Sequence, residues 1–441
     1  MNCVTVTIIS IMFRVFFLFL DNLYGWAMSK ALPTHDFRWL SQEDIHQLDV
    51  TAVADDAQEG YILECDIIYP THLHDRHNDY PLAPESQTID SNLISPYARE
   101  LASKIGQSHV GGTRKLVNNL QDKTRYVVHY QNLKLYMRLG LEVTKVHKVL
   151  AFKQSPWMQP YINFNTQKRA QSQNDFEKSF WKLMNNAVFG KTMENLRNRV
   201  NIQLVQDSKK FRKLVAKPNF RSFRIFNKDL TGVQLHKTSL TLNKPIYVGF
   251  SILETSKILM YEYHYDVIKA QYGDRARLLF TDTDSLCYHI ETNDMYEDMS
   301  KDAHLYDFSD YPCNHPLFSI HNKKVLGKMK DETKSIPIKE FVGLRSKMYS
   351  ILVGNEEEKK TAKGITAAAK KNFKHESYLQ CLQDEVVLMA SMHQIRSFKH
   401  ELYTIRMTKI GLSPYDDKRF LCDSINSLAY GHYHIPKNLE I

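Results

Sequence analysis

Two carboxylates lie two residues apart in the polar stretch Phe280–Ser285, which reads FTDTDS. Apolar residues flank this stretch on both sides, which predicts two buried strands joined by a turn. Because residues two apart in extended backbone face the same side, Asp282 and Asp284 are placed to hold one divalent cation. An ordinary acidic turn is the alternative. An EF-hand Ca²⁺ loop is excluded, since it requires Gly at the position of Cys287 and Glu at the position of Asn293.

The chain as a whole is basic and long enough for several subdomains. It has 441 residues, and 58 Lys and Arg against 49 Asp and Glu give a formal charge of +9. An excess of this sign favours a polyanionic partner such as nucleic acid. The six cysteines are scattered without a Cys-x-x-Cys pair, which argues against a disulfide framework and a zinc site. We therefore expect an intracellular protein, in the nucleus or cytoplasm, that is not secreted.

The first twenty residues need separate treatment because the segment Cys3–Leu20 is almost wholly apolar. Such a segment resembles a signal peptide or a membrane span. However, Arg14 interrupts it, no basic residue precedes it, and no small-residue cleavage site follows it. Its content of Val, Ile and Phe suits a buried strand. Membrane insertion is therefore the less favoured interpretation.

The remaining segments mix strand and helix patterns, which indicates the α+β class. Apolar residues at spacings of three and four predict a helix over 174–198 and another over 245–270. The other expected segments are a strand at 61–70, a strand followed by helix within 116–152, a basic exposed excursion at 208–244, a strand through 341–349, and a largely helical basic region at 356–406.

A cluster of histidines and aspartates follows the strand expected at 61–70. A metal site and a solvated loop both account for such a cluster, and the neighbouring prolines and mixed spacing favour the loop. Its members are His72, His74, Asp75, His77 and Asp79.

Three separated stretches match one protein family in the correct order. Lys182–Gly190 (KLMNNAVFG) matches a Lys-x-x-x-Asn-Ser-x-Tyr-Gly motif, with Ala187 for Ser and Phe189 for Tyr. Phe280–Ser285 matches Tyr-x-Asp-Thr-Asp-Ser, and Arg345–Tyr349 (RSKMY) matches a later Lys-x-Tyr motif. The sequence thus resembles family B DNA polymerases of the protein-primed, viral and organellar branch, which includes polymerases of the virus-like Maverick/Polinton DNA transposons.

This resemblance implies a right-hand architecture in which a palm with an antiparallel sheet carries helical fingers and a mainly helical thumb, with the exonuclease domain absent. Its implied segments are 1–30 for the first part of the palm, 31–160 for an insertion, 161–200 for the fingers, 201–244 for the basic excursion, 245–352 for the rest of the palm, and 353–441 for the thumb and tail.

The resemblance also implies a two-metal site for Mg²⁺, with Mn²⁺ as a substitute, held by Asp284 and Asp282. Primer-template DNA and deoxynucleoside triphosphates are the implied partners, and a terminal priming protein is a further one that would contact the region between Tyr24 and Lys182. The residues implied for nucleotide binding are Lys182, Arg169, Lys168, Asn186, Phe189, Gly190 and Tyr24, and those implied for DNA binding are Lys347, Tyr349 and Arg345.

One departure from the family pattern concerns its first palm motif, Asp-x-x-(Ser/Asn)-Leu-Tyr. Asn22-Leu23-Tyr24 matches the end of this motif, but Phe19 occupies the Asp position, and a benzyl side chain cannot coordinate Mg²⁺. Asp21 is the substitute to consider as a catalytic carboxylate, although it lies about 6–7 Å further along a strand. The stretch Glu64–Tyr69 has the same spacing with Glu64 in the Asp place, but it lacks the Asn-Leu pair.

Two functions follow from these observations. The first is a DNA-directed DNA polymerase core that transfers a nucleotide from a triphosphate to a primer 3′-hydroxyl, impaired by Phe19. The second is an N-terminally truncated, non-catalytic DNA-binding remnant of a mobile element, motivated by the apolar start and by Phe19.

Overall fold

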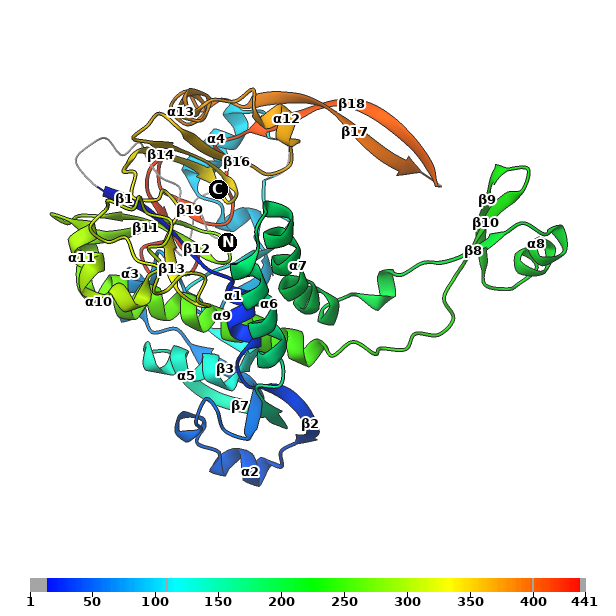
Figure 1. The fold of residues 1–441 in the computed structure, drawn as a ribbon, viewed down its shortest axis with the longest axis horizontal. Helices are drawn as coiled ribbons and strands as arrows, with labels where there is room; N and C mark the ends of the chain where they lie inside the picture. The colour runs from blue at the N-terminus through cyan, green and yellow to red at the C-terminus, as the bar shows by residue number, and fades with distance from the viewer. Residues whose placement is uncertain (1–13, 108–109, 399, 437–441) are drawn as a thin grey trace.

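The computed structural model describes residues 14–107, 110–398 and 400–436. Its centre is an antiparallel sheet of seven strands in the order β11-β12-β1-β14-β15-β16, with β13 paired to β1 (Figure 1). The strands are β1 (Arg14–Leu20), β11 (Ala276–Thr281), β12 (Ser285–Ile290), β13 (Met329–Asp331), β14 (Ile338–Arg345), β15 (Met348–Val353) and β16 (Glu358–Ala362).

Strand β1 lies inside this sheet and contributes to two apolar cores. Leu18 and Leu20 belong to the largest core, whereas Val15 and Phe17 pack on the opposite face with Phe280. This alternation is that of a strand buried on both faces, so the strand interpretation is confirmed for Arg14–Leu20. The earlier part of the apolar segment lies outside the described residues. Among the described residues, no helix has the length and apolar character needed to span a bilayer.

A long helix packs across the sheet and carries much of the largest core. α9 (Ile246–Glu262) continues through a π-helical turn at Tyr263–Ile268 into α10 (Lys269–Tyr272), which confirms the helix expected over 245–270. The hydroxyl of Tyr265 donates to the Tyr80 carbonyl at 2.7 Å, so the π-helical turn is tied to the loop that follows α3 (His74–His77).

Four strands within residues 31–160 form a second sheet with the order β2-β7-β3-β6. Its strands are β2 (Leu32–Trp39), β3 (Glu59–Ile68), β6 (Lys123–His129) and β7 (Glu142–Ser155), and they carry the helices α2 (Gln42–Gln47) and α5 (Tyr130–Arg138). The expected strand at 61–70 is confirmed by β3. The expectation that helix extends to residue 152 is wrong, because the helix stops at Arg138 and the β-branched residues beyond Gly140 continue as a 14-residue strand.

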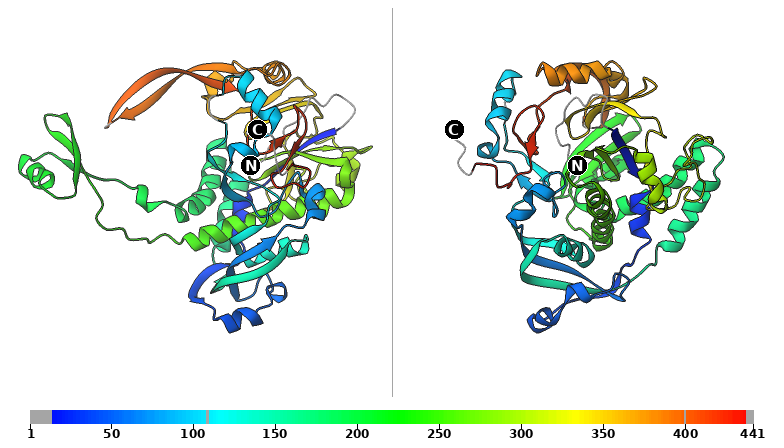
Figure 2. Two further views of the ribbon diagram at one scale, coloured as in Figure 1. Left: turned by 180° about the vertical axis from the view of Figure 1, so that it is seen from behind. Right: turned by 90° about the vertical axis from the view of Figure 1, so that its left-hand side faces the viewer.

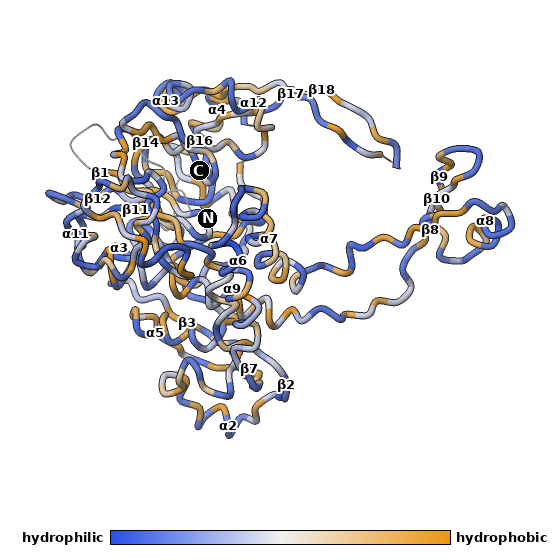
Figure 3. Tube along the Cα trace, in the orientation of Figure 1, coloured by the Kyte–Doolittle hydropathy of each residue, from blue (hydrophilic) through white to orange (hydrophobic). Residues whose placement is uncertain are grey.

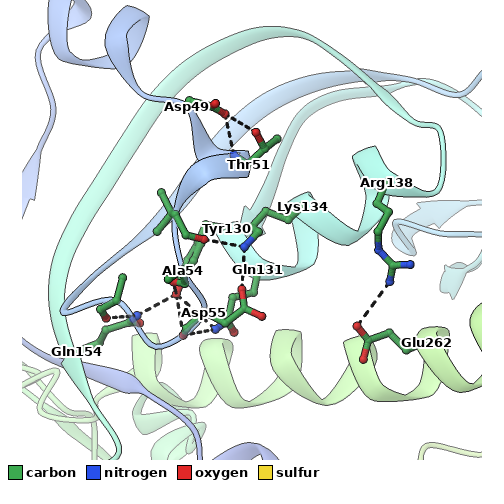
Figure 4. A network of polar contacts seen from close by, with 12 residues as sticks. Asp49, Thr51, Ala54, Asp55, Tyr130, Gln131, Lys134, Arg138, Gln154 and Glu262 are labelled. Atoms are coloured by element: carbon green, nitrogen blue, oxygen red, sulfur yellow. Dashed lines mark hydrogen bonds and ion pairs between the residues drawn. The ribbon is translucent and has the colours of Figure 1, made fainter.

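Helix α5 is fixed to a preceding loop by polar contacts (Figure 4). The Tyr130 hydroxyl donates to the carbonyl groups of Ala54 and Asp55 at 3.2 and 3.1 Å, and the Gln131 side chain donates to Asp55 at 2.7 Å. The Lys134 ammonium donates to the Val53 carbonyl at 2.6 Å. These bonds satisfy loop carbonyls that no strand partner reaches.

Two helices stand beside the end of β1. α6 (Gln159–Gln171) and α7 (Asp175–Thr192) are joined by a hydrogen bond from the Asn165 amide to the Asn185 amide oxygen at 2.9 Å, with both side chains buried. Asn174 caps α7 by accepting from the Glu177 N–H. The expected helix over 174–198 is therefore confirmed up to Thr192, and a 3₁₀ turn follows at Leu196–Asn198.

The basic stretch after α7 is a small folded module that projects from the body (Figure 1). It consists of β8 (Asn201–Val205), α8 (Ser208–Val215), β9 (Phe220–Asn227) and β10 (Leu230–Leu235). Its own core contains Val205, Leu214, Val233 and Leu235. The excursion expected at 208–244 is thus exposed, as its charge indicated, but most of it is folded.

The expectation of a largely helical region over 356–406, and with it a mainly helical thumb, is wrong. Only α12 (Ala367–Lys370) and α13 (His375–Gln383) are helical, and the long hairpin of β17 (Leu388–Phe398) and β18 (Glu401–Leu412) follows. β-branched and aromatic residues are frequent in β18 (Tyr403, Thr404, Ile405, Thr408 and Ile410), which favours a strand, and the lysines that suggested a helix, from Lys359 to Lys374, precede the hairpin. Exposed apolar side chains remain along this hairpin (Figure 3), including Ile395 and Leu402 at 77% and 76% exposure.

The far end of the hairpin approaches the module (Figure 2), and side chains join the two. Arg224 on β9 forms an ion pair with Glu401 on β18, and the rings of Phe226 and His400 lie 6.2 Å apart. Two projections that begin at different parts of the body therefore touch at their far ends.

After β18 the chain returns to the body as β19 (Phe420–Leu421) and β20 (Ser427–Leu428). Tyr415 and Tyr430 of this segment share a core with Ala98 on α4 (Pro96–Lys104) and with Val117, which ends β5 (Arg114–Val117). Strand β5 pairs with β4 (Glu85–Thr88).

Candidate functional site

The acidic stretch forms the predicted hairpin tip between β11 and β12. The Asp282 N–H donates to the Ser285 carbonyl at 3.0 Å, the Ser285 N–H donates back at 3.2 Å, and Thr283 has a left-handed φ of 59°. Thr283 and Asp284 are therefore the two residues of a tight turn that Asp282 and Ser285 close. This turn, and not strand alternation, brings the two carboxylates to one end of the sheet.

Asp284 lies in an environment that disfavours its charge. Burial raises its pKa above the ordinary value, and the carboxylates of Asp282 and Glu332 raise it further, whereas the ammonium of Lys182 opposes the shift. A buried carboxylate with two like charges nearby gains stability from any added cation. Asp282 is less enclosed and has the Lys347 ammonium 3.6 Å from its carboxylate.

The end of β1 lies directly beside this tip. The Leu20 N–H donates to the Asp284 carbonyl at 2.6 Å, and Phe19 pairs with Ser285. The half-buried Phe19 ring thus occupies the strand position next to the two carboxylates, where a shared ligand would be needed. It offers no lone pair to a cation.

Asp21 does not occupy that position. Its carboxylate is buried, with 3% of the side chain exposed, and the guanidinium of Arg169 on α6 lies 3.1 Å from one oxygen. The second oxygen is buried without a hydrogen-bond partner. The charge of Asp21 also raises the pKa of Lys324, which burial lowers overall. The Asp21 carboxylate therefore lies with the cations Arg169 and Lys324, to the side of the tip where α6 stands.

Glu332 is a third carboxylate near the tip that the sequence motifs do not mark. It directly follows β13, and its N–H donates to the Phe17 carbonyl at 2.9 Å. Lys359 lies 3.6 Å from its carboxylate. No local sequence pattern predicts a role for Glu332, because only the pairing of β13 with β1 brings it to the site.

The basic residues expected for nucleotide binding separate into two groups. Lys182 on α7 is exposed and lies close enough to Asp284 to lower its pKa, and Arg169 is held at Asp21. Lys168 points elsewhere, with its ammonium 5.6 Å from the ring of Phe164. The geometry thus brings Lys182 and Arg169 to the tip and leaves Lys168 outside.

Two aromatic rings close the space between β1 and α7. Tyr24 on α1 (Leu23–Met28) stacks on Phe189, with centroids 4.4 Å apart and an interplanar angle of 18°. Burial raises the pKa of Tyr24, and the charge of Asp284 adds to this shift. Asn186 is half-buried on the same helix, and a Cβ added to Gly190 would meet no atom within 4 Å. Packing within the chain therefore does not require glycine at position 190.

Two residues of the Arg345–Tyr349 motif lie on the side of the tip opposite α7. Tyr349 on β15 stacks on Phe280 with centroids 4.2 Å apart, and Lys347 approaches Asp282. A pocket of about 410 Å³ beside them is lined by Tyr24, Thr283 and Lys347, among others. Arg345 is directed away from this pocket, toward buried Asp416, whose pKa its charge lowers against the raising effect of burial.

The stretch Glu64–Tyr69, which has the spacing of the first palm motif, lies in another part of the fold. Glu64 is on β3 of the second sheet and pairs with Arg125 at 2.8 Å, while the Tyr69 hydroxyl contacts His77 at 2.8 Å. Neither side chain faces the tip, so the stretch Glu64–Tyr69 is not an alternative first motif.

The tip has the donor set that one divalent cation requires, namely two carboxylates whose mutual repulsion a cation would relieve. A second cation beside it would need a further carboxylate from the strand that carries Phe19. Asp21 is engaged by Arg169, and Glu332 stands on the neighbouring strand. The residues present thus fit one cation and do not fit the complete two-cation arrangement.

No protein-family model and no curated protein sequence matches the chain. Solved structures do match it. Phi29 DNA polymerase in an orthorhombic crystal form gives a TM-score of 0.54 at 13% identity over 93% of this chain and 61% of that chain. Its complex with primer-template DNA gives a TM-score of 0.51 at 16% identity, over 92% of this chain and 59% of that chain. Its ternary complex with primer-template DNA and incoming nucleotides gives a TM-score of 0.53 at 14% identity, over 93% of this chain and 59% of that chain. The chain spans about three fifths of the polymerase chains that it matches, and it has the fold of Phi29 DNA polymerase.

Proposed function

We propose that the chain is the core of a DNA-directed DNA polymerase of the family B type. The observation that carries this proposal is the convergence of three separated sequence motifs on one hairpin tip, in a fold shared with a DNA polymerase. In this proposal the seven-stranded sheet and α9 form the palm, α6 and α7 form the fingers, and the β17–β18 hairpin belongs to the thumb. Residues 31–160 are the insertion, and the basic module follows the fingers.

Each residue at the tip has a role in this reaction. Lys182 and Arg169 neutralise the incoming triphosphate, since both lie on the fingers side of Asp284 and guanidinium and ammonium groups bind phosphate strongly. Tyr24 and Phe189 line the sugar and base pocket, with Asn186 and Gly190 beside them. Lys347 and Tyr349 steady the primer-template duplex on the opposite side.

Asp284, with Asp282, would hold a divalent cation that supplies Lewis acidity to the triphosphate, whereas lowering the pKa of the primer hydroxyl would need a second cation beside it. Mg²⁺ is the cation that such oxygen ligands select, and Mn²⁺ is a substitute. Because Phe19 removes one carboxylate from this set, we infer that the attacking hydroxyl is poorly activated. Each 1.36 kcal/mol of lost transition-state stabilisation lowers the rate about tenfold, and the loss of one cation removes several kcal/mol.

Single-turnover primer extension tests this proposal. The assay compares the unaltered chain with the variants Phe19→Asp, Asp284→Ala and Asp21→Ala. We expect extension at least about a thousandfold below that of a competent polymerase, a partial gain in Phe19→Asp, and no extension in Asp284→Ala. Fast extension that Asp21→Ala abolishes would instead assign the missing carboxylate to Asp21.

A non-catalytic DNA-binding protein is the second candidate, and Phe19 is the observation that favours it. The two candidates differ in one result. If Phe19→Asp restores no extension with either Mg²⁺ or Mn²⁺, while the chain still binds primed DNA more tightly than a control protein of equal charge, the DNA-binding function remains and the polymerase is rejected. Protein priming, a mobile-element origin, N-terminal truncation and a nuclear or cytoplasmic location stay predictions.

A further inference from the structure

The C-terminal segment lies against the loop that contains α3, at a distance from the hairpin tip. Arg419 donates to the Asn78 carbonyl at 2.9 Å, and the Ala429 N–H donates to the Asn78 side chain at 2.8 Å. The Leu120 N–H donates to the Tyr430 carbonyl at 2.7 Å. These hydrogen bonds alone position the segment that follows β20 against this loop, without a bound ion.

Three potential metal ligands meet at this contact. Asp75 on α3 and the two histidines His432 and His434 each offer a ligand atom, and these atoms all lie within 4.8 Å of one another. The Nε2 atom of His432 is 3.3 Å from Oδ1 of Asp75. With metal–ligand distances of about 2.0–2.1 Å, the edge of a tetrahedron is also about 3.3 Å. His434 is exposed, so its ring has room to turn toward the other two ligands.

A buried histidine on α3 holds the segment at this place. His74 is 5% exposed, its ring lies 5.7 Å from that of His432, and its Nδ1 accepts from the Tyr433 N–H at 3.1 Å. His74 does not belong to the three-ligand cluster, but it fixes the backbone between the two histidines that do.

We propose that Asp75, His432 and His434 bind a divalent transition-metal cation, best fitted by Zn²⁺, which fastens the C-terminal segment to α3. Two imidazoles and one carboxylate form a ligand set that suits Zn²⁺ and does not suit Mg²⁺, which prefers oxygen ligands only. Asp75 and His434 are both exposed, so the fourth position is open to water.

The hydrogen bonds of His432 are compatible with this role at the cost of one of them. The His434 N–H donates to its Nδ1 at 3.2 Å, which leaves the ring proton on Nε2, facing Asp75. When a metal binds Nε2, the proton moves to Nδ1, and coordination replaces the bond from His434.

This site acts on the part of the chain that returns from the β17–β18 hairpin. The segment after Leu412 reaches α3 and ends there among the described residues. A metal that joins this segment to α3 fixes the base of the hairpin against the loop that also contacts Tyr265 on the π-helical turn. Its role is structural and is independent of the proposed polymerase reaction.

Metal binding to the full-length chain, prepared without a histidine tag and stripped of metal, tests the proposal. Excess Mg²⁺ is included to occupy the carboxylates at the hairpin tip. We expect equilibrium dialysis to give about one bound Zn²⁺ per chain, and Co²⁺ to give the visible absorption of a tetrahedral site. His434→Gln should lower the affinity for Zn²⁺ by more than about tenfold.

Two matched variants separate this site from others. His46→Gln removes an exposed histidine on α2 that does not belong to the cluster and should leave Zn²⁺ binding unchanged, as should Asp284→Ala. Zn²⁺ should also raise the melting temperature of the unaltered chain and not that of His434→Gln. Equal Zn²⁺ binding by the unaltered chain and His434→Gln, or no binding by either, would overturn the proposal.

Discussion

Lys182 and Lys168 are matched lysines on neighbouring helices, and the structure directs only one of them to the hairpin tip. We predict that Lys182→Ala weakens nucleotide binding by at least about tenfold while primer-template affinity changes little, because the proposed function places this charge on the triphosphate. Lys168→Ala is the control and should change nucleotide binding less than about twofold. Nucleotide-dependent fluorescence quenching and a gel-shift assay measure the two affinities. Equal loss of both in Lys182→Ala would contradict the assignment.

The raised pKa of Asp284 predicts how the stability of the chain depends on pH. Folding raises the pKa of Asp284 and therefore favours its protonated form. The resulting stabilisation is complete below the ordinary carboxyl pKa of about 4, and it is lost as the pH rises through the higher pKa of the folded chain. Asp284→Asn should therefore raise the melting temperature at pH 7 without divalent cations, and the gain should shrink as the pH is lowered toward 4.

The control for this experiment is Asp175→Asn, since the Asp175 side chain is 98% exposed and its removal should leave the melting temperature nearly unchanged. Mg²⁺ should raise the melting temperature of the unaltered chain and have a smaller effect on Asp284→Asn. A destabilised Asp284→Asn at pH 7 would show that the carboxylate is better compensated than its surroundings indicate.

Gly190 allows a test of ligand approach that does not perturb packing. A Cβ at this position meets no atom of the chain, and Ala is a better helix former than Gly by about 1 kcal/mol. Gly190→Ala should thus keep or raise thermal stability and reduce nucleotide or DNA binding, measured on the same preparation. Unchanged binding of both ligands would remove Gly190 from the site.

At the scale of elements, the contact between the β17–β18 hairpin and the basic module predicts an effect on processivity. Glu401→Lys replaces the partner of Arg224 by a like charge and should separate the two tips. If DNA passes between these projections, the variant should give shorter products per binding event in the presence of a DNA trap, in a background made active by Phe19→Asp.

Glu357→Lys makes the same charge change on an exposed residue between β15 and β16 and serves as the control. Shortening in both variants would reflect net charge and not the contact between the tips. Products of unchanged length in Glu401→Lys would show that closure of the two projections does not retain DNA.

The sequence predicted elements with a strong period or turn signal and failed where two signals conflicted. The hairpin around Asp282 was predicted because apolar strands flank a turn, and α9 because its apolar residues repeat at helical spacing. The β17–β18 hairpin was missed because the lysines that precede it, from Lys359 to Lys374, suggested an exposed helix, whereas β-branched and aromatic residues are frequent in β18.

Within the site, local motifs marked the hairpin tip and α7 but could not give their mutual contacts. The pair Asp21–Arg169 joins residues 148 positions apart, and Glu332 reaches the tip only through the pairing of β13 with β1. Such contacts depend on the register of strands and the packing of helices. No spacing rule in the sequence encodes them.

For the whole molecule, the excess of 58 Lys and Arg over 49 Asp and Glu predicts DNA affinity that falls steeply with salt. Each phosphate neutralised on duplex DNA contributes a slope of about −0.9 to the dependence of log affinity on log salt concentration. Fluorescence anisotropy between about 50 and 200 mM salt measures this slope. A flat response would show that the basic residues face solvent and not a phosphate backbone.

Under the proposed function, the ion pair of Asp21 and Arg169 makes the Asp21 carboxylate compete with the incoming nucleotide for the Arg169 guanidinium. The Asp21 side chain is 3% exposed and already lies against that guanidinium. A ligand with more negative charge displaces a carboxylate from a guanidinium more readily, so this proposal favours triphosphates over monophosphates. Asp21→Asn should then raise the affinity for nucleoside diphosphates relative to triphosphates.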